Sequence, residues 1–306
     1  MAGREEELRR KIESLRKEKR AVILAHNYQP PEIQDIADFV GDSLQLSLRA
    51  TETDAKIIVF CGVNFMAETA AILNPDKKVL IPDLNALCPM ASMLPAALVK
   101  IYKRRYPKAK VVLYVNTLAE AKALSDAVCT SANPAEVIEI MESETVLFGP
   151  DWNLAQYAKR LTEKEVIPIP EYGFCPVHKV FKREDILRLK EAHPDAEVMA
   201  HPECDPEVHE VADFIGSTSR MCRRVRASKA EEFIVATENG LLHRLVKERK
   251  ASYIPAHPYA ICVNMKLHTL EKLYLSLRDE KFEVKVPEKI AAPARRAIEV
   301  MLKARG

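Results

Sequence analysis

The sequence predicts an α/β fold made of three homologous three-layer α/β/α domains, with small parallel sheets around a pseudo-threefold axis. Three observations predict it. Short apolar runs alternate with helical segments, which is typical of parallel strands joined by right-handed crossovers. The same order of features occurs three times along the 306 residues. Finally, Cys88, Cys175 and Cys262 follow one another at steps of 87 residues, and each closes one copy.

Each copy is expected to run strand, helix, strand, helix, strand, and then to reach its cysteine. A charged amphipathic helix over 5–19 precedes the first copy, and the tail after Pro287 follows the third. Sheets covered by helices on both faces do not need strands that alternate polar and apolar residues. The expected strands are 21–25, 57–60 and 79–81 in the first copy, 111–114, 145–148 and 166–169 in the second, and 197–200, 233–236 and 252–254 in the third.

Polar residues keep the same register in all three copies. Steps of 88 and then 87 residues carry His26 to Tyr114 and on to His201. Several features in one order and one register indicate a triplication, because a chance match would align one pair at most. The predicted divisions are an N-terminal helix over 1–20, repeats over 21–107, 108–194 and 195–282, and a C-terminal extension over 283–306.

The composition excludes several classes of protein. The 46 Lys and Arg against 44 Asp and Glu leave a net charge of +2, so no basic surface for nucleic acid is expected. No apolar run approaches the ~20 residues of a membrane-spanning helix, and the start is too charged for a signal peptide. We therefore expect a cytoplasmic protein that binds neither nucleic acid nor a membrane.

The end of the first strand in each copy is polar. Ligands of open parallel sheets bind outside the carboxyl ends of the strands, so we expect these side chains to share one cavity. The alternative is that they are ordinary strand-to-loop positions, where polar residues are common. The three equivalent sets are His26, Asn27 and Tyr28 in the first copy, Tyr114, Val115 and Asn116 in the second, and His201, Pro202 and Glu203 in the third.

Any phosphate must be held without a glycine-rich loop, since the eight glycines are too dispersed for a dinucleotide fingerprint or a P-loop. Ser43, Ser131 and Thr218 occupy equivalent positions and are each expected to open a helix. Ser and Thr are favoured N-caps, and capping alone would explain them. Three helix N-termini near one axis would also favour an anion.

The seven cysteines divide into two groups. Cys88, Cys175 and Cys262 are equivalent, and three thiols converging on an axis suggest a metal centre. Zinc with three protein ligands and a water is one interpretation, and an iron–sulfur cluster with one open iron is the other. The chain contains no Cys-x-x-Cys pair. The remaining cysteines have no counterparts in all three copies, and we assign no role to Cys61, Cys129, Cys204 and Cys222.

Ten motifs give the chain a resemblance to the quinolinate synthase family, in uninterrupted order over roughly residues 20–285. They are AHNYQ (25–29), GDSLQL (41–46), PD-x4-CPMA (82–91), LYVN (113–116), CTSAN (129–133), FGPD-x-NL (148–154), CPVH (175–178), HPEC (201–204), GST (216–218) and CVNM (262–265). The resemblance implies three α/β/α domains with the active site at their junction. It also implies a 4Fe–4S cluster on Cys88, Cys175 and Cys262, with the fourth iron open.

The resemblance further implies a transferase of NAD biosynthesis that condenses iminoaspartate with dihydroxyacetone phosphate into quinolinate, phosphate and water. Iminoaspartate is unstable in water, so transient handover from an aspartate oxidase or dehydrogenase is expected to help. The open iron would act as a Lewis acid. Substrate contacts are then expected from His26, Ser43, Tyr114, Val115, Asn116, Ser131, His201, Pro202, Glu203 and Thr218.

Matching residue chemistry to this reaction assigns the catalytic groups. Glu203 is the expected general base, because it is the only carboxylate in the strand-end set. Tyr28 and His26 are expected to move protons at the triose, and Tyr114 to line the pocket. His178, three residues after Cys175, is a weaker candidate. The competing classes are a zinc- or iron–sulfur-dependent lyase or hydrolase, an iron–sulfur sensor and a plain binding protein.

Overall fold

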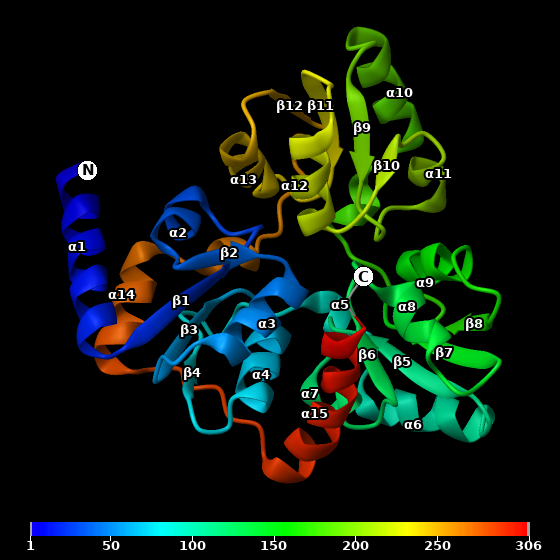
Figure 1. The fold of residues 1–306 in the computed structure, drawn as a ribbon, viewed down its shortest axis with the longest axis horizontal. Helices are drawn as coiled ribbons and strands as arrows, with labels where there is room; N and C mark the ends of the chain where they lie inside the picture. The colour runs from blue at the N-terminus through cyan, green and yellow to red at the C-terminus, as the bar shows by residue number, and fades with distance from the viewer. Residues whose placement is uncertain (1, 305–306) are drawn as a thin grey trace.

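Three separate four-stranded parallel sheets form the framework of the molecule, one in each copy of the repeat. The computed structural model describes residues 2–304. Figure 1 shows the three sheets arranged around a common centre, each with helices beside it, so the predicted fold class is confirmed. The strand orders are β2-β1-β3-β4, β6-β5-β7-β8 and β10-β9-β11-β12, which are one topology repeated three times.

The strands are short and bury their central members. In the first sheet they are β1 (Ala21–His26), β2 (Phe39–Gly41), β3 (Ile57–Cys61) and β4 (Lys78–Leu80). The second sheet holds β5 (Lys110–Tyr114), β6 (Ala127–Cys129), β7 (Thr145–Gly149) and β8 (Glu165–Pro168). The third holds β9 (Glu197–Ala200), β10 (Phe214–Ile215), β11 (Glu232–Ala236) and β12 (Ser252–Pro255).

The helices connect these strands and extend the chain at both ends. They are α1 (Ala2–Glu18), α2 (Pro31–Ile36), α3 (Ser43–Glu52), α4 (Asn64–Leu73), α5 (Pro89–Ser92), α6 (Ala96–Arg105), α7 (Ala119–Lys122), α8 (Pro134–Glu139), α9 (Trp152–Lys159), α10 (Arg183–Ala192), α11 (Pro206–His209), α12 (Thr218–Ala227), α13 (Leu241–Glu248), α14 (Leu270–Asp279) and α15 (Glu288–Lys303). No helix in this described part of the chain is long and apolar enough to cross a membrane.

The expected three strands per copy are wrong, because each sheet has a fourth. The additional strands are β2, β6 and β10, which pair with β1, β5 and β9 at the edges of the sheets. Strands of two or three residues are too short to show a hydrophobic period. An aspartate precedes each of them, and its carboxylate accepts the backbone N–H of the neighbouring strand at 2.8 Å: Asp38 from Ile23, Asp126 from Val111 and Asp213 from Val198.

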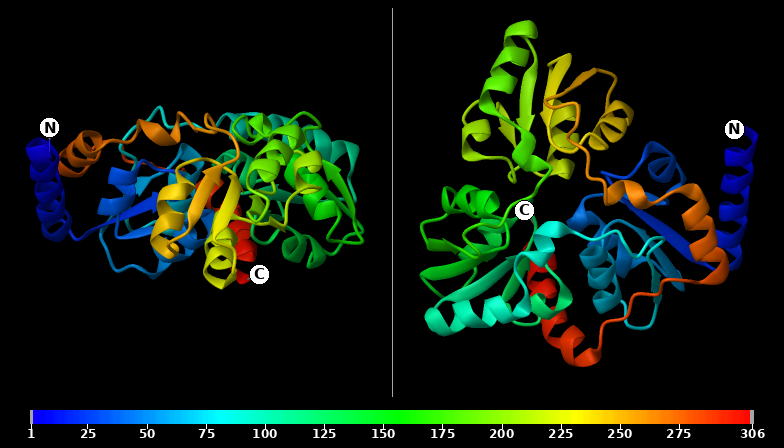
Figure 2. Two further views of the ribbon diagram at one scale, coloured as in Figure 1. Left: turned by 90° about the horizontal axis from the view of Figure 1, so that it is seen from above. Right: turned by 180° about the vertical axis from the view of Figure 1, so that it is seen from behind.

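The terminal helices join the repeats from outside. Leu8, Ile12 and Leu15 of α1 share an apolar cluster with α14. At the other end, α15 packs against the second sheet and against α4 of the first copy, and Asn133 bonds the backbone of Met301. Figure 2 shows α15 between the first two copies. Among the described residues, no terminal helix packs in this way between the third copy and another. The exact domain boundaries stay a prediction from the repeat.

Candidate functional site

One cavity lies where the three copies meet. It encloses about 920 Å³, including solvent at its mouth, and all three copies contribute to its wall. Most of the residues predicted from the sequence line it, and these are His26, Tyr28, Ser43, Cys88, Tyr114, Asn116, Ser131, Cys175, His201, Glu203, Thr218 and Cys262. The strand-end and cysteine sets therefore meet in one place, as the repeat predicted.

Three residues of the strand-end sets do not line this cavity in the described structure. Asn27 donates to Thr218 Oγ1 at 2.8 Å, Val115 is packed into the main apolar core, and Pro202 is buried. Each is the middle residue of its strand-end set. The chain turns or bends as it leaves the strand, so residues that share a register there do not all face the same way.

The helix starts differ from the expectation in detail. Ser43 and Thr218 are the first residues of α3 and α12, but the capping side chains are Asp42 and Ser217, which also bond each other at 3.2 Å. Ser131 was expected to open a helix, and that is wrong, because α8 begins only at Pro134. Proline suits the first helical position since it lacks an N–H and has a fixed φ. Of the three equivalent positions, only Ser43 and Thr218 therefore lie at a helix N-terminus.

His26 and His201 are oriented in the same way. The Nδ1 atom of each accepts a backbone N–H two residues on, from Tyr28 at 3.2 Å and from Glu203 at 3.3 Å. Burial lowers the pKa of both imidazoles to about 3, so both are neutral near pH 7. Because Nδ1 is an acceptor, the hydrogen-bonding pattern assigns the ring proton to Nε2. Each histidine is thus a neutral N–H donor.

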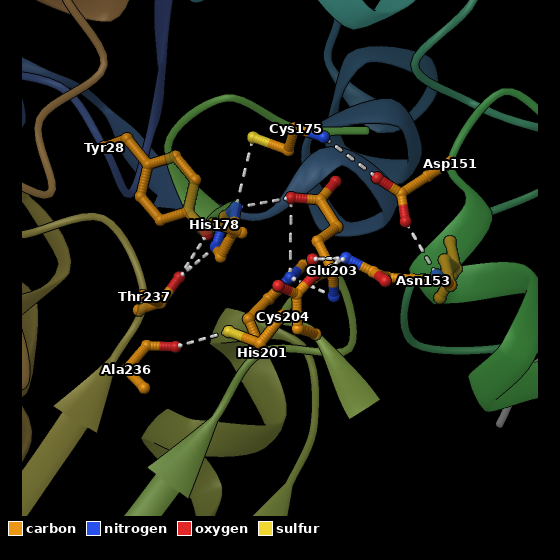
Figure 3. Close-up of polar contacts among 12 residues, drawn as sticks. Tyr28, Asp151, Asn153, Cys175, His178, His201, Glu203, Cys204, Ala236 and Thr237 are labelled. Atoms are coloured by element: carbon orange, nitrogen blue, oxygen red, sulfur yellow. Dashed lines mark hydrogen bonds and ion pairs between the residues drawn. The ribbon is translucent and has the colours of Figure 1, made fainter. Parts of the chain in front are cut away.

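A continuous chain of hydrogen bonds links Tyr28 to Glu203 (Figure 3). The Tyr28 hydroxyl lies 2.7 Å from Thr237 Oγ1, which lies 2.8 Å from His178 Nε2. His178 Nδ1 then lies 2.7 Å from Glu203 Oε2 and 3.2 Å from Cys175 Sγ. An ionised carboxylate only accepts, so Nδ1 carries the proton, Thr237 donates to Nε2, and Tyr28 donates to Thr237. We call these four residues the relay.

Sequence reasoning missed Thr237 and undervalued His178. In the repeat register, Thr237 corresponds to Gly62 and Pro150, neither of which has a hydroxyl. A search for residues that are alike in all copies therefore passes over it. The available signal was its place directly after β11, at the carboxyl end of a sheet strand.

Burial and charge set the protonation of the site. Burial alone would raise the pKa of Glu203, but His178, His201 and the Tyr114 hydroxyl together outweigh it and lower that pKa to about 2. Glu203 Oε1 has no hydrogen-bond partner among the described residues. Burial, and then the charge of Glu203, raise the pKa of Tyr28, Tyr114 and Asp151. Glu203 is therefore ionised at neutral pH, while both phenols keep their protons.

Two sets of metal-binding side chains face the cavity. Atoms of Cys175, His178 and Glu203 lie within 4.8 Å of one another and can hold a metal ion. Within residues 2–304, the sulfurs of Cys88, Cys175 and Cys262 do not form so tight a set. Zinc, with bonds of about 2.3 Å, would hold three sulfurs about 3.8 Å apart.

The other cysteines lie away from this set. Cys61, Cys129, Cys204 and Cys222 are buried, whereas the three cavity cysteines are partly exposed, and none of the seven forms a disulfide. Burial raises the pKa of Cys61, Cys88 and Cys222 to about 12, so the thiol pKa does not separate the two groups. The exposure of the thiols to the cavity agrees with the division of the cysteines made from the repeat.

Comparison with known proteins connects the chain to one family. The family model described as quinolinate synthetase A protein matches residues 10–303. A quinolinate synthase of Methanothermobacter thermautotrophicus is 57% identical over 298 residues, covering 97% of this chain and 98% of that protein. A quinolinate synthase of Pyrococcus furiosus is 54% identical with the same coverage. One of Methanocaldococcus jannaschii is 52% identical over 299 residues, covering 96% of this chain and 97% of that protein.

Proposed function

The chain belongs to the quinolinate synthetase A family, and we propose that it is itself a quinolinate synthase of NAD biosynthesis. In this proposal it joins iminoaspartate to dihydroxyacetone phosphate. The products are quinolinate, one inorganic phosphate and two waters, which balances the atoms of the two substrates. The observation that carries the proposal is the single cavity in which three equivalent thiols meet the strand-end residues of all three copies.

Cys88, Cys175 and Cys262 would hold a 4Fe–4S cluster in this cavity. Three thiolates leave one iron without a protein ligand, and such an iron supplies Lewis-acid chemistry at a substrate oxygen. The free, partly exposed state of these three cysteines and their place in the wall of one cavity support this assignment. We place the protein in the cytoplasm, where thiols stay reduced.

The substrates carry two carboxylates and a phosphate, and the cavity offers donors for them. His26 and His201 present neutral N–H groups. Ser43 and Thr218 add hydroxyls at two helix N-termini, where amides and the helix dipole favour negative charge. Asn116 and Ser131 complete the polar wall. These groups bind anions without any glycine-rich loop.

The relay would move the protons that condensation, enolisation and dehydration require. A proton taken by Tyr28 from the triose passes to Thr237, then to His178, and reaches Glu203 without any large movement. Glu203 is ionised and so accepts directly, while Tyr114 and Tyr28 are protonated and so donate. Positioned acid–base groups of this kind typically contribute about 10²–10⁴ in rate.

The test is anaerobic purification followed by iron and sulfide analysis and an assay for quinolinate. About four irons and four sulfides per chain and formation of quinolinate are expected. Cys175→Ser should lose the cluster, whereas Cys222→Ala should keep it, because Cys222 is buried in α12 away from the cavity. A loaded protein that forms no quinolinate from both substrates contradicts the proposed activity.

A second candidate is a zinc-dependent lyase or hydrolase. The observation in its favour is the tight group of Cys175, His178 and Glu203, whose sulfur, nitrogen and oxygen donors suit zinc. That candidate predicts colourless protein with one zinc per chain, so the same metal analysis separates the two. Handover of the imine from an aspartate oxidase or dehydrogenase is a further part of the proposal. Faster quinolinate formation from enzymatically generated imine than from pre-formed imine would support it.

A further inference from the structure

A side-chain oxygen accepts the backbone N–H of every cavity cysteine, and the three acceptors stand at the same distance along the chain from their cysteines. Each acceptor precedes its cysteine by 24 residues. The bonds are Asn64 Oδ1 to Cys88 N at 3.1 Å, Asp151 Oδ2 to Cys175 N at 3.1 Å, and Glu238 Oε1 to Cys262 N at 3.0 Å. One bond of this kind would be ordinary loop geometry. Three at one spacing and nearly one length indicate a shared role.

A second bond closes each loop from the opposite direction. A backbone N–H donates to the carbonyl two residues before the cysteine, from the acceptor residue itself in the first copy and from the residue after it in the other two. These bonds are Asn64 N to Ala86 O at 2.8 Å, Trp152 N to Gly173 O at 2.8 Å, and Asn239 N to Ala260 O at 2.9 Å. Every cysteine loop is therefore attached at two points, the carbonyl two residues before the cysteine and the N–H of the cysteine itself.

The acceptors lie on rigid parts of the fold. Each follows an inner strand, namely β3, β7 or β11, at or near the start of the next helix. The side chains of Asp151 and Glu238 are fully buried. Burying a carboxyl group raises the free energy of the folded state unless the group is hydrogen-bonded or paired with an opposite charge. Asp151 also caps α9 through Leu154 N at 2.7 Å, and Glu238 also pairs with Lys266 at 2.8 Å.

We infer that Asn64, Asp151 and Glu238 are the positioning residues of the metal centre, one for each cysteine ligand. They fix the position of each thiol. They also bind the backbone N–H of the cysteine, so that this N–H cannot turn toward the sulfur. Hydrogen bonds to cluster sulfurs are among the features that set the properties of such a centre. Because the centre they position is the proposed cluster, this inference rests on the proposed function.

The decisive comparison separates this role from helix capping at position 151. Serine is a good N-cap but is too short to reach Cys175 N as well. Asparagine is no control here, because its single acceptor oxygen cannot replace the two carboxylate oxygens that bind Leu154 N and Cys175 N. Asp151→Ser should therefore keep α9 and lose the loop attachment, and the unsubstituted protein is its reference. At position 64, Asn64→Ala removes the acceptor and Asn64→Asp retains one, with no cap at stake because Asn64 makes no capping bond.

The measurement is the rate at which an iron chelator bleaches the reconstituted holoprotein under anaerobic conditions. Loss of an outer-shell partner typically costs about 10- to 100-fold in metal affinity. We expect Asp151→Ser to release iron at least about tenfold faster than the unsubstituted protein, and Asn64→Ala at least about tenfold faster than Asn64→Asp. Equal release rates within each pair would overturn the inference.

A second measurement tests the attachment of the cysteine loops separately from the proposed function. Iron and sulfide analysis of the unsubstituted protein decides whether a cluster binds at all. Amide hydrogen exchange of the metal-free protein decides the attachment independently. Asp151→Ser should speed exchange over 171–178 and leave the strands of the second sheet unchanged, whereas Asn64→Ala, which frees a different cysteine loop, should leave exchange over 171–178 unchanged. Unchanged exchange over 171–178 in Asp151→Ser would contradict the attachment even if the cluster binds.

Discussion

The first and third copies place different chemistry on the same backbone turn. Each has a histidine at the end of its first strand, His26 or His201, held by the same bond from Nδ1 to a backbone N–H. The residue two places later is Tyr28 in one copy and Glu203 in the other, and the relay joins these two equivalent positions through residues of neighbouring loops. The two copies of the turn thus share one backbone geometry. The difference between Tyr28 and Glu203 within it places a phenol at one end of the relay and a carboxylate at the other.

The buried residues that bond these strand-end turns also differ in chemistry between the copies. Positions 34, 122 and 209 are equivalent, and each buries a donor to the carbonyls of its own strand-end turn. Gln34 donates to the carbonyls of Asn27 and Gln29. Lys122 donates to the Thr117 carbonyl, and His209 Nε2 lies 3.1 Å from the His201 carbonyl. The first copy therefore uses a neutral amide where the third uses a titratable imidazole.

The largest expected effect comes from removing the base end of the relay. Glu203→Gln keeps the shape of the side chain but can no longer take up a proton, so kcat should fall by about 10³-fold. Iron and sulfide content should not change. Glu207→Gln, on the exposed side of α11, is the control and should retain activity. Near-normal turnover of Glu203→Gln would remove it as the base.

Removing the acid end should have a smaller effect. Tyr28→Phe keeps the ring and loses the hydroxyl that bonds Thr237 at 2.7 Å. We expect kcat to fall by about 10²-fold, since Tyr114 and the two neutral histidines still offer donors in the cavity. The pH profile of kcat checks this, because loss of the relay should also remove its basic limb. An unchanged basic limb would show that Tyr28 only packs.

Interrupting the middle of the relay should lower kcat less than either substitution at its ends. Thr237→Val has nearly the same shape and lacks the hydroxyl between Tyr28 and His178, so kcat should fall by about tenfold. Thr237→Ser restores a hydroxyl and should recover activity to within a few-fold. Equal losses in the two variants would mean that the hydroxyl is not part of proton transfer.

The smallest effect concerns stability and compares positions 34 and 209 directly. Burial lowers the pKa of His209 to about 4, so the unfolded chain binds a proton there below about pH 6.5 while the folded chain does not. Stability is therefore lost as the pH falls from 6.5 toward 4. His209→Gln places the first copy's residue in the third. Between pH 7 and pH 5, the free energy of unfolding should therefore fall by about 2 kcal/mol less in His209→Gln than in the unsubstituted chain.

Urea unfolding of the metal-free protein at the two pH values measures this difference. If His209→Gln loses as much stability on acidification as the unsubstituted chain, His209 does not titrate on unfolding. The neutral His26 and His201, with pKa values of about 3, contribute in the same direction in both proteins and cancel in the comparison.

Much of the cavity could be predicted because the repeat makes equivalent residues visible in one chain. Cys88, Cys175 and Cys262 were identified by spacing alone, and all three line the cavity. The sequence did not reveal Thr237, whose counterparts lack a hydroxyl, or the edge strands, which are too short to show a period. It also placed Val115 and Pro202 among the contact residues, because register identifies a position but not the direction of its side chain.

The sequence by itself determined the α/β class, the threefold repeat, the separation of three cysteines from the other four, and the strand-end residues. Only the tertiary structure decided which of these groups bond one another. Periodicity along a chain reports what the copies share, since each copy repeats the same local backbone. The relay depends on what the copies do not share, and its residues come from all three copies: Tyr28 from the first, His178 from the second, Thr237 and Glu203 from the third. The chain of hydrogen bonds from Tyr28 to Glu203 therefore exists only when the three copies pack together.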